Sequence, residues 1–164
     1  MTQVLRPTWI MPENTIVITD TSCFIILDKI DALYLLPKLF AHVITTPEIA
    51  QEYGKTLPGW VNITPVQNNL LQSELNELVD PGEASAIALA AEIKCDYLLT
   101  DDRAARKFAE QRGITVKGSA GVLLYAKQQR VIPLLRPYLQ LIQQTNFRIS
   151  PSLVDRLIKE AGEE

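Results

Sequence analysis

Acidic side chains follow two short apolar runs of this sequence and open the helical patterns that come next. Ile16–Thr19 is followed by Asp20, and Tyr97–Thr100 is followed by Asp101 and Asp102. Both runs are typical of buried parallel strands, whose carboxyl ends meet at one edge of a sheet, where ligands bind. Carboxylates held together there repel one another unless a cation lies between them. Mg²⁺ and Mn²⁺ suit such a site, because they prefer carboxylate and water oxygens.

Two glutamates extend this acidic set. Glu52 lies in a helical pattern that begins at Thr46-Pro47, and Glu83 lies three residues after Asp80, where an alanine-rich helix begins. Each acidic residue also has a structural explanation: a helix cap, a capping box, a solvated side chain or a favourable place near a helix dipole. Their joint placement favours phosphodiester hydrolysis, in which a metal ion orients a water and stabilises the leaving oxygen. The predicted catalytic residues are Asp20, Glu52, Glu83 and Asp102.

The elements that must position these residues alternate along the chain. We expect strands at 15–19, 43–45, 61–64, 97–100 and 114–116. Helices are expected at 23–29, 32–40, 47–53, 68–79, 80–94, 103–112, 118–129, 134–144 and 151–161. This alternation predicts an α/β fold with three layers (α/β/α) and a central, mainly parallel sheet. We expect residues 1–14 to be an N-terminal extension and residues 15–164 to form a single domain.

The overall charge limits how a polyanion could bind. The net charge is −3, so the chain has no general basic field. Four cations that follow the second acidic site could form a local phosphate-binding rim, although they could equally be solvated: Arg103, Arg106, Lys107 and Lys117.

The sequence shows no signal-peptide pattern and no membrane-spanning run, so we expect a cytoplasmic protein with no membrane partner. Cys23 and Cys95 are expected to be reduced thiols.

The order of these motifs resembles the PIN domain, a fold of metal-dependent ribonucleases that includes the VapC-like toxins of toxin–antitoxin pairs. The resemblance rests on five segments in order: 16–22, 47–52, 82–90, 98–103 and 118–124. The segment Phe147–Ser150 and the helix after it are also similar to an uncharacterised prokaryotic branch of that family.

The resemblance assigns roles residue by residue. It implies metal ligands at Asp20, Glu83, Asp101 and Asp102, of which Asp102 matches the family motif and Asp101 is its neighbour. It also implies Glu52 as a further ligand or a general base acting through water. It implies that hydroxyl groups support the site, from Thr21, Ser22 and Thr100. Where many relatives carry a further acidic or amide residue, this chain has Arg103–Arg106. That departure leaves one metal ion or two as open alternatives.

The resemblance thus implies a Mg²⁺- or Mn²⁺-dependent endoribonuclease with RNA as its substrate. One role that it implies is that of the toxin of a type II toxin–antitoxin pair, which would bind an antitoxin protein. It also implies a homodimer. A first alternative is a PIN fold without catalysis that binds nucleic acid or protein. A second is a phosphoacceptor receiver domain, which also places aspartates at strand ends. The receiver reading leaves Glu52 and Glu83 without roles, and it expects an acidic pair where this chain has Asp20-Thr21.

Overall fold

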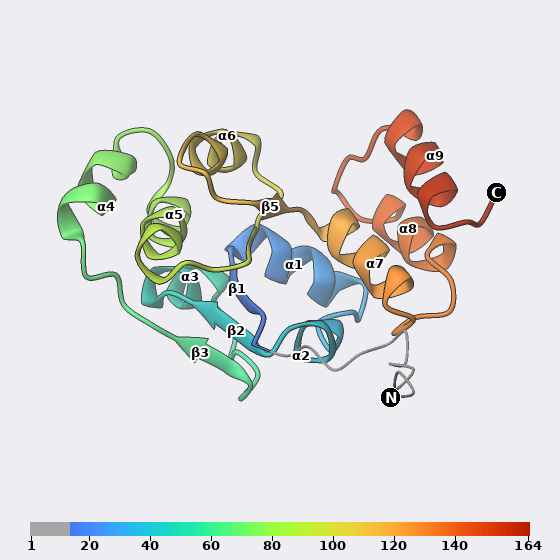
Figure 1. Cartoon of the computed structure of the whole chain (residues 1–164), viewed down its shortest axis with the longest axis horizontal. Helices are drawn as coiled ribbons and strands as arrows, with labels where there is room; N and C mark the ends of the chain where they lie inside the picture. The colour runs from blue at the N-terminus through green and yellow to red at the C-terminus, as the bar shows by residue number, and fades with distance from the viewer. Residues whose placement is uncertain (1–13) are drawn as a thin grey trace, which may run out of the picture.

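A five-stranded, wholly parallel sheet forms the centre of the molecule (Figure 1). The computed structural model describes residues 14–164. The predicted N-terminal extension, 1–14, therefore lies outside the described residues except for Asn14. The sheet and its flanking helices confirm the predicted α/β class and parallel pairing.

The strand order places the first strand in the middle. The order is β3-β2-β1-β4-β5, with β1 (Ile16–Thr19) between β2 (His42–Thr45) and β4 (Tyr97–Leu99). The outer strands are β3 (Val61–Ile63) and β5 (Val116–Lys117). The chain runs outward in one direction from β1 to β3, and then in the other direction from β4 to β5. The point between β1 and β4, where the direction changes, is where open α/β sheets bind ligands.

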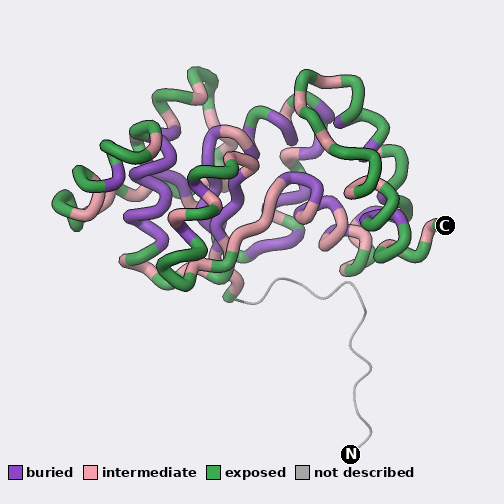
Figure 2. The backbone as a smooth tube through the Cα atoms, turned by 90° about the horizontal axis from the view of Figure 1, so that it is seen from above, coloured by how far each residue is buried: buried purple, intermediate pink, exposed green. Residues whose placement is uncertain are grey.

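Helices pack on this sheet through apolar faces. The longest, α5 (Pro81–Ile93), is buried from Gly82 to Ala90 and packs on β1 and β4, as its alanine-rich sequence predicts. The others before β5 are α1 (Thr21–Lys29), α2 (Leu35–Leu39), α3 (Pro47–Tyr53), α4 (Asn69–Asn76) and α6 (Arg103–Gln111). Figure 2 shows a buried interior, to which β1, β2, β4 and the inner sides of these helices contribute residues, whereas β3 and β5 are half-buried or exposed.

Three helices follow the sheet. α7 (Ser119–Gln128) packs on β5 and α1, and α8 (Arg136–Gln143) and α9 (Pro151–Glu160) lie beyond it, at the opposite end of the molecule from α4 (Figure 1). The Glu163 carboxylate connects the end of the chain to the start of α8, because it accepts hydrogen bonds from the backbone N–H groups of Leu135 (2.6 Å) and Arg136 (3.1 Å).

Several boundaries differ from the sequence predictions. The helix expected from residue 32 begins at Leu35, because the left-handed backbone of Asp31 (φ 56°) starts a turn there. Pro37 falls in the first turn of this short helix, where proline is tolerated. The helix expected to reach Val79 ends at Asn76. The last strand is Val116–Lys117, where it pairs with Leu98 and Leu99 of β4, rather than residues 114–116.

No helix among residues 14–164 has the length and apolar character needed to cross a membrane.

Candidate metal centre

Asp20 occupies the carboxyl end of the central strand and is almost completely buried, with 2% of its surface exposed. It is the N-cap of α1, and its Oδ1 accepts a hydrogen bond from Thr21 N–H at 2.8 Å. Burial raises the pKa of Asp20 to about 6, although hydrogen bonds from Thr100 and Thr21 oppose the rise. The negative charges of Asp80 and Glu52 add to it. A buried carboxylate surrounded by other carboxylates favours a cation beside it.

Hydroxyl groups join the two strand ends. Thr100 Oγ1, which is buried, donates to Asp20 Oδ2 at 2.7 Å and accepts from Asp102 N–H at 3.2 Å. Ser22 Oγ lies 3.4 Å from Asp20 Oδ2 and accepts from Asp101 N–H at 3.0 Å. These are the supporting positions that the resemblance implies for Ser22 and Thr100. The Thr21 hydroxyl is buried and has no hydrogen-bond partner among the described residues.

Glu83 and Asp102 form a carboxyl–carboxylate pair. Burial and hydrogen bonds with Asp102 and Asp80 raise the pKa of Glu83 to about 9. The hydrogen bond from Glu83, together with two backbone N–H groups, lowers the pKa of Asp102 despite partial burial. A raised pKa on one carboxyl group and a lowered pKa on its neighbour is the pattern of two carboxyl groups that share a proton. A divalent cation could replace that proton, because metal binding to carboxylates competes with protons.

The start of α5 brings a further acidic residue to the site. Asp80 Oδ1 accepts from Glu83 N–H at 2.8 Å, and Asp80 N–H donates to Glu83 Oε1 at 3.2 Å, which completes a capping box. Sequence reasoning treated Asp80 as a cap alone and missed its charge near Asp20 and Glu83. The signal was present in the sequence, since Asp80-Pro81-Gly82-Glu83 places two carboxylates at one helix start.

Glu52 reaches this site across Gly82. A Cβ atom added at Gly82 would come within 2.5 Å of Glu52 Oε2, so the absence of a side chain there leaves room for the carboxylate. α3 and α5 are tied beside this point: Thr46, the N-cap of α3, bonds Ser85 Oγ at 2.6 Å, and Ser85 Oγ donates to Gly82 O at 2.7 Å. The structure therefore brings together Asp20, Glu52, Asp80, Glu83 and Asp102.

Asp101, predicted as a metal ligand, points elsewhere. Its Oδ1 accepts from Ser119 N–H at 2.8 Å and its Oδ2 from Ser119 Oγ at 2.5 Å, at the start of α7. Gly118 permits this approach, because a Cβ atom there would lie 2.7 Å from Asp101 Oδ1. Both oxygens therefore join β4 to α7, and a role of Asp101 as a metal ligand stays a prediction. Ser119 was missed as their partner, and the sequence holds no local signal that pairs residues 101 and 119.

The four predicted substrate-binding cations separate into two groups. Arg103 and Arg106 line a pocket beside Asp101. Lys107 is exposed and does not line that pocket, and its Nζ lies 5.8 Å from the Phe108 ring centroid. Lys117 also lines that pocket, and its Nζ lies over the rings of Tyr97 (4.5 Å) and Tyr125 (5.2 Å).

The chemical type of the clustered side chains suits a hard divalent cation. All five clustered side chains offer carboxylate oxygens, which Mg²⁺ and Mn²⁺ prefer. Within residues 14–164, no group of three Asp, Glu, His or Cys side chains is placed so that it could hold a metal ion in this structure. Asp20, Glu83 and Asp102 are nevertheless connected, through Thr100 and through the Glu83–Asp102 pair.

The fold and this edge of the sheet define a class of protein. The family model of the PIN domain matches residues 16–163. The chain therefore belongs to the PIN domain family, whose members are generally nucleases that use divalent metal ions. A search of curated proteins finds no match to the chain.

Proposed function

We propose that this protein is a Mg²⁺- or Mn²⁺-dependent endoribonuclease. The observation that carries the proposal is the meeting of carboxylates from four distant segments at the switch point of a PIN fold: Asp20, Glu52, Asp80-Glu83 and Asp102. Such a concentration of buried and partly buried acids is costly without a cation, and a cation there would face any strand bound across the sheet edge.

The residues have distinct tasks in this proposal. Asp20, Glu83 and Asp102 hold the metal ion, and Thr100 fixes the orientation of Asp20 and the backbone of Asp102. Glu52, which is exposed, accepts the proton of the attacking water. When bound, the metal ion supplies Lewis-acid stabilisation of the charge on the phosphate and the leaving oxygen.

The cellular role that we propose is that of the toxin in a type II toxin–antitoxin pair, with RNA as the substrate. This assignment rests on the resemblance to VapC-like toxins, and it implies an antitoxin partner and a homodimer in the cytoplasm. A small upstream gene for an antitoxin-like protein would support it, and a gene neighbourhood without such a partner would count against it.

Asp20→Asn tests the activity. We expect the wild-type protein to cleave single-stranded RNA in Mn²⁺ and the variant not to, while the variant stays folded, because Asn also caps helices well. The matched control is Asp31→Asn at an exposed left-handed position that Asn tolerates. Equal cleavage by wild type and Asp20→Asn would contradict the proposal.

Thermal stability distinguishes the alternative, a PIN fold without catalysis. A bound ion stabilises the folded state by mass action, by about 2.7 kcal/mol at a hundred times its Kd. We therefore expect Mn²⁺ to raise the Tm of the wild type and of Asp31→Asn, but not that of Asp20→Asn. No cleavage together with no rise in the wild-type Tm would favour the inactive binding module.

A further inference from the structure

A hollow with both polar and apolar lining lies beside Asp101. It has a volume of about 550 Å³. Five of its lining residues are basic: Arg103, Arg106, Lys117, Arg148 and Arg156. Asp101 is the one acidic residue of the lining. We call this hollow the arginine pocket.

Two distant parts of the chain build the arginine pocket. One wall is the start of α6 with the turn from β5 to α7, and the other is the C-terminal segment 147–157. In that segment Phe147 and Ile149 are half-buried against the core, whereas Arg148 between them is exposed. On α9, Leu153 and Leu157 pack inward beside Arg156, which is exposed. The apolar residues thus hold the segment in place and leave both arginines at the pocket.

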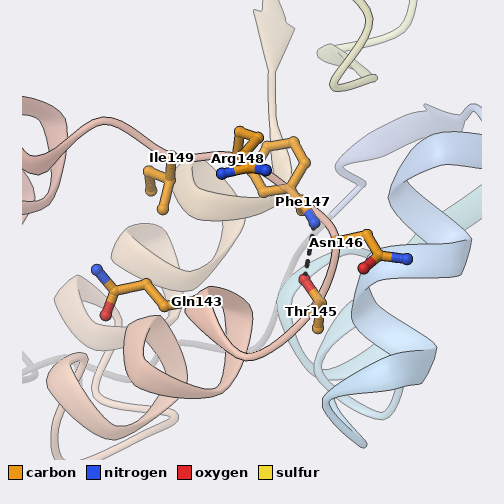
Figure 3. Close-up of a pocket in the computed structure, with 6 residues that line it drawn as sticks. All are labelled: Gln143, Thr145, Asn146, Phe147, Arg148 and Ile149. Carbon is orange, nitrogen blue, oxygen red and sulfur yellow. Dashed lines mark hydrogen bonds between the residues drawn. The ribbon is translucent and has the colours of Figure 1, made fainter.

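The turn before this wall is itself fixed by a hydrogen bond. Figure 3 shows Thr145 Oγ1 accepting from Phe147 N–H, at 3.1 Å, with Arg148 and Ile149 following in the chain. Phe147, Arg148 and Ile149 also line a neighbouring hollow. The exposed side chain of Arg148 can therefore reach solvent.

The charge of the arginine pocket is not balanced from within. Five cations against one carboxylate give its lining a formal charge of +4, on a chain whose net charge is −3. The Asp101 oxygens are engaged by Ser119. Among the described residues, the one ion pair that these cations make is Arg106 Nη1–Glu110 Oε2, at 4.0 Å. The Lys117 ammonium lies over the rings of Tyr97 and Tyr125, and the other four cations of the lining are arginines.

Arginines gathered in this way suit a phosphate-bearing ligand. The planar guanidinium group binds phosphate oxygens through two parallel hydrogen bonds, and several of them side by side repel one another until an anion is bound. Asp101, at the pocket, is the chain neighbour of Asp102, in the carboxylate cluster, so the two sites adjoin at the same sheet edge. A strand bound at the cluster can continue into the arginine pocket.

We infer that the arginine pocket binds the phosphate backbone of the nucleic-acid substrate next to the cleavage site, and that Arg148 and Arg156 make the C-terminal segment part of the substrate-binding surface. This inference deepens the proposed function and rests on it. It extends the predicted rim of Arg103 and Arg106 by residues whose place beside them the sequence did not show. Phosphate contacts of this kind position the strand without reading its sequence.

The test measures binding without cleavage. A fluorescein-labelled single-stranded RNA is titrated with protein in EDTA, and fluorescence anisotropy gives Kd at several salt concentrations. We expect the double variant Arg148→Ala/Arg156→Ala to weaken binding about tenfold at low salt. The slope of log K against log salt should fall by about 1.4, because each phosphate contact to a single strand contributes about 0.7.

Two further variants make the result specific. Lys159→Ala removes one exposed cation from the same helix but not from the pocket, and its Kd and salt slope should stay near those of the wild type. Arg148→Lys/Arg156→Lys keeps the charge but not the planar fork, so it should keep most of the salt slope and lose affinity.

The outcomes separate this inference from the proposed activity. An unchanged Kd and slope in the double alanine variant, or an equal loss in Lys159→Ala, would overturn the role of the pocket even if Mn²⁺-dependent cleavage is seen. Loss of binding in the double alanine variant alone would support it even if the wild type does not cleave. A wild type that binds no RNA at low salt would overturn it as well.

Discussion

At the scale of single residues, three of the clustered carboxylates cap helices. Asp20 caps α1, Asp80 caps α5 and Asp102 caps α6, so each satisfies backbone N–H groups at a helix start. Capping does not exclude the metal binding that we propose for Asp20 and Asp102, because both helices start beside the sheet edge where the strands end. Asn can replace Asp as a cap, so Asp→Asn substitutions test metal binding with little effect on folding.

The adjacent residues Asp101 and Asp102 provide a matched pair of substitutions that separates the loss of a metal ligand from the loss of a structural hydrogen bond. We expect Asp102→Asn to lose the Mn²⁺-induced rise in Tm, because it removes a proposed ligand, and to stay close to wild type in EDTA. Asp101→Asn should keep the rise in Mn²⁺. It should lose about 1–2 kcal/mol of unfolding free energy in EDTA, because an amide cannot accept both bonds from Ser119.

Thermal melts of both variants with and without Mn²⁺ give the answer. A loss of about 1–2 kcal/mol corresponds to a fall in Tm of roughly 2–8 °C for a chain of this size. If Asp101→Asn abolished the Mn²⁺ effect while Asp102→Asn preserved it, the assignment of the two carboxylates would be reversed.

The sequence identified most acidic positions but not how they point. Asp20, Glu83 and Asp102 could be selected because strand ends and helix starts have local signatures. Asp101 could not be separated from Asp102, because its direction is set by Ser119, eighteen positions away. The place of the Lys117 ammonium depends in the same way on Tyr97 and Tyr125, which other elements supply.

At the scale of helices and strands, the C-terminal part depends on one carboxylate. Burial alone would raise the pKa of Glu163, but hydrogen bonds from Leu135 and Arg136 N–H and the charge of Lys127, 3.3 Å away, outweigh it and lower the pKa. A lowered pKa in the folded state means that ionisation stabilises the fold. That contribution is complete above the ordinary pKa of 4.5 and is lost as the pH falls below it, through the lower folded value.

Glu163→Gln should therefore destabilise the protein in a pH-dependent way. We expect a loss of about 1–2 kcal/mol of unfolding free energy at pH 7, since a buried charged acceptor is removed from two N–H donors. The difference from wild type should shrink as the pH is lowered from about 5 to 3. Glu164→Gln, at the exposed next position, is the control and should match the wild type throughout. A Tm difference that is constant across this range would show that the charge of Glu163 is not the cause.

Elements with local signals were predicted well. The strand runs, the Thr46-Pro47 start of α3 and the Asp80–Glu83 capping box all appear as the sequence indicates. The boundaries that failed depend on tertiary contacts. β5 is limited to the two residues that meet β4, and α2 starts only after the turn at Asp31.

At the scale of the whole molecule, the topology explains why these residues meet. With β1 at the centre and β4 beside it, the ends of two strands separated by about eighty positions become neighbours, and Thr100 bonds directly to Asp20. The sequence predicted a parallel sheet, but strand order is a property of the complete fold. The arginine pocket is beyond sequence analysis for the same reason, because its walls come from α6 and from the C-terminal segment.

The topology also places acidic and basic side chains next to each other. The chain is acidic overall, yet a carboxylate cluster and the arginine pocket adjoin at one edge of the sheet. A metal ion would neutralise the first, and the phosphate backbone would neutralise the second. This pairing accounts for how an acidic protein could hold a polyanion.

The central claim is that a divalent ion binds among Asp20, Glu83 and Asp102. The most direct test is a crystal grown with Mn²⁺, with anomalous diffraction data that locate the ion. We expect an anomalous peak at roughly 2–2.3 Å from carboxylate oxygens of these three residues. Mn²⁺ bound only elsewhere on the molecule, with these carboxylates still joined by hydrogen bonds at saturating Mn²⁺, would contradict it.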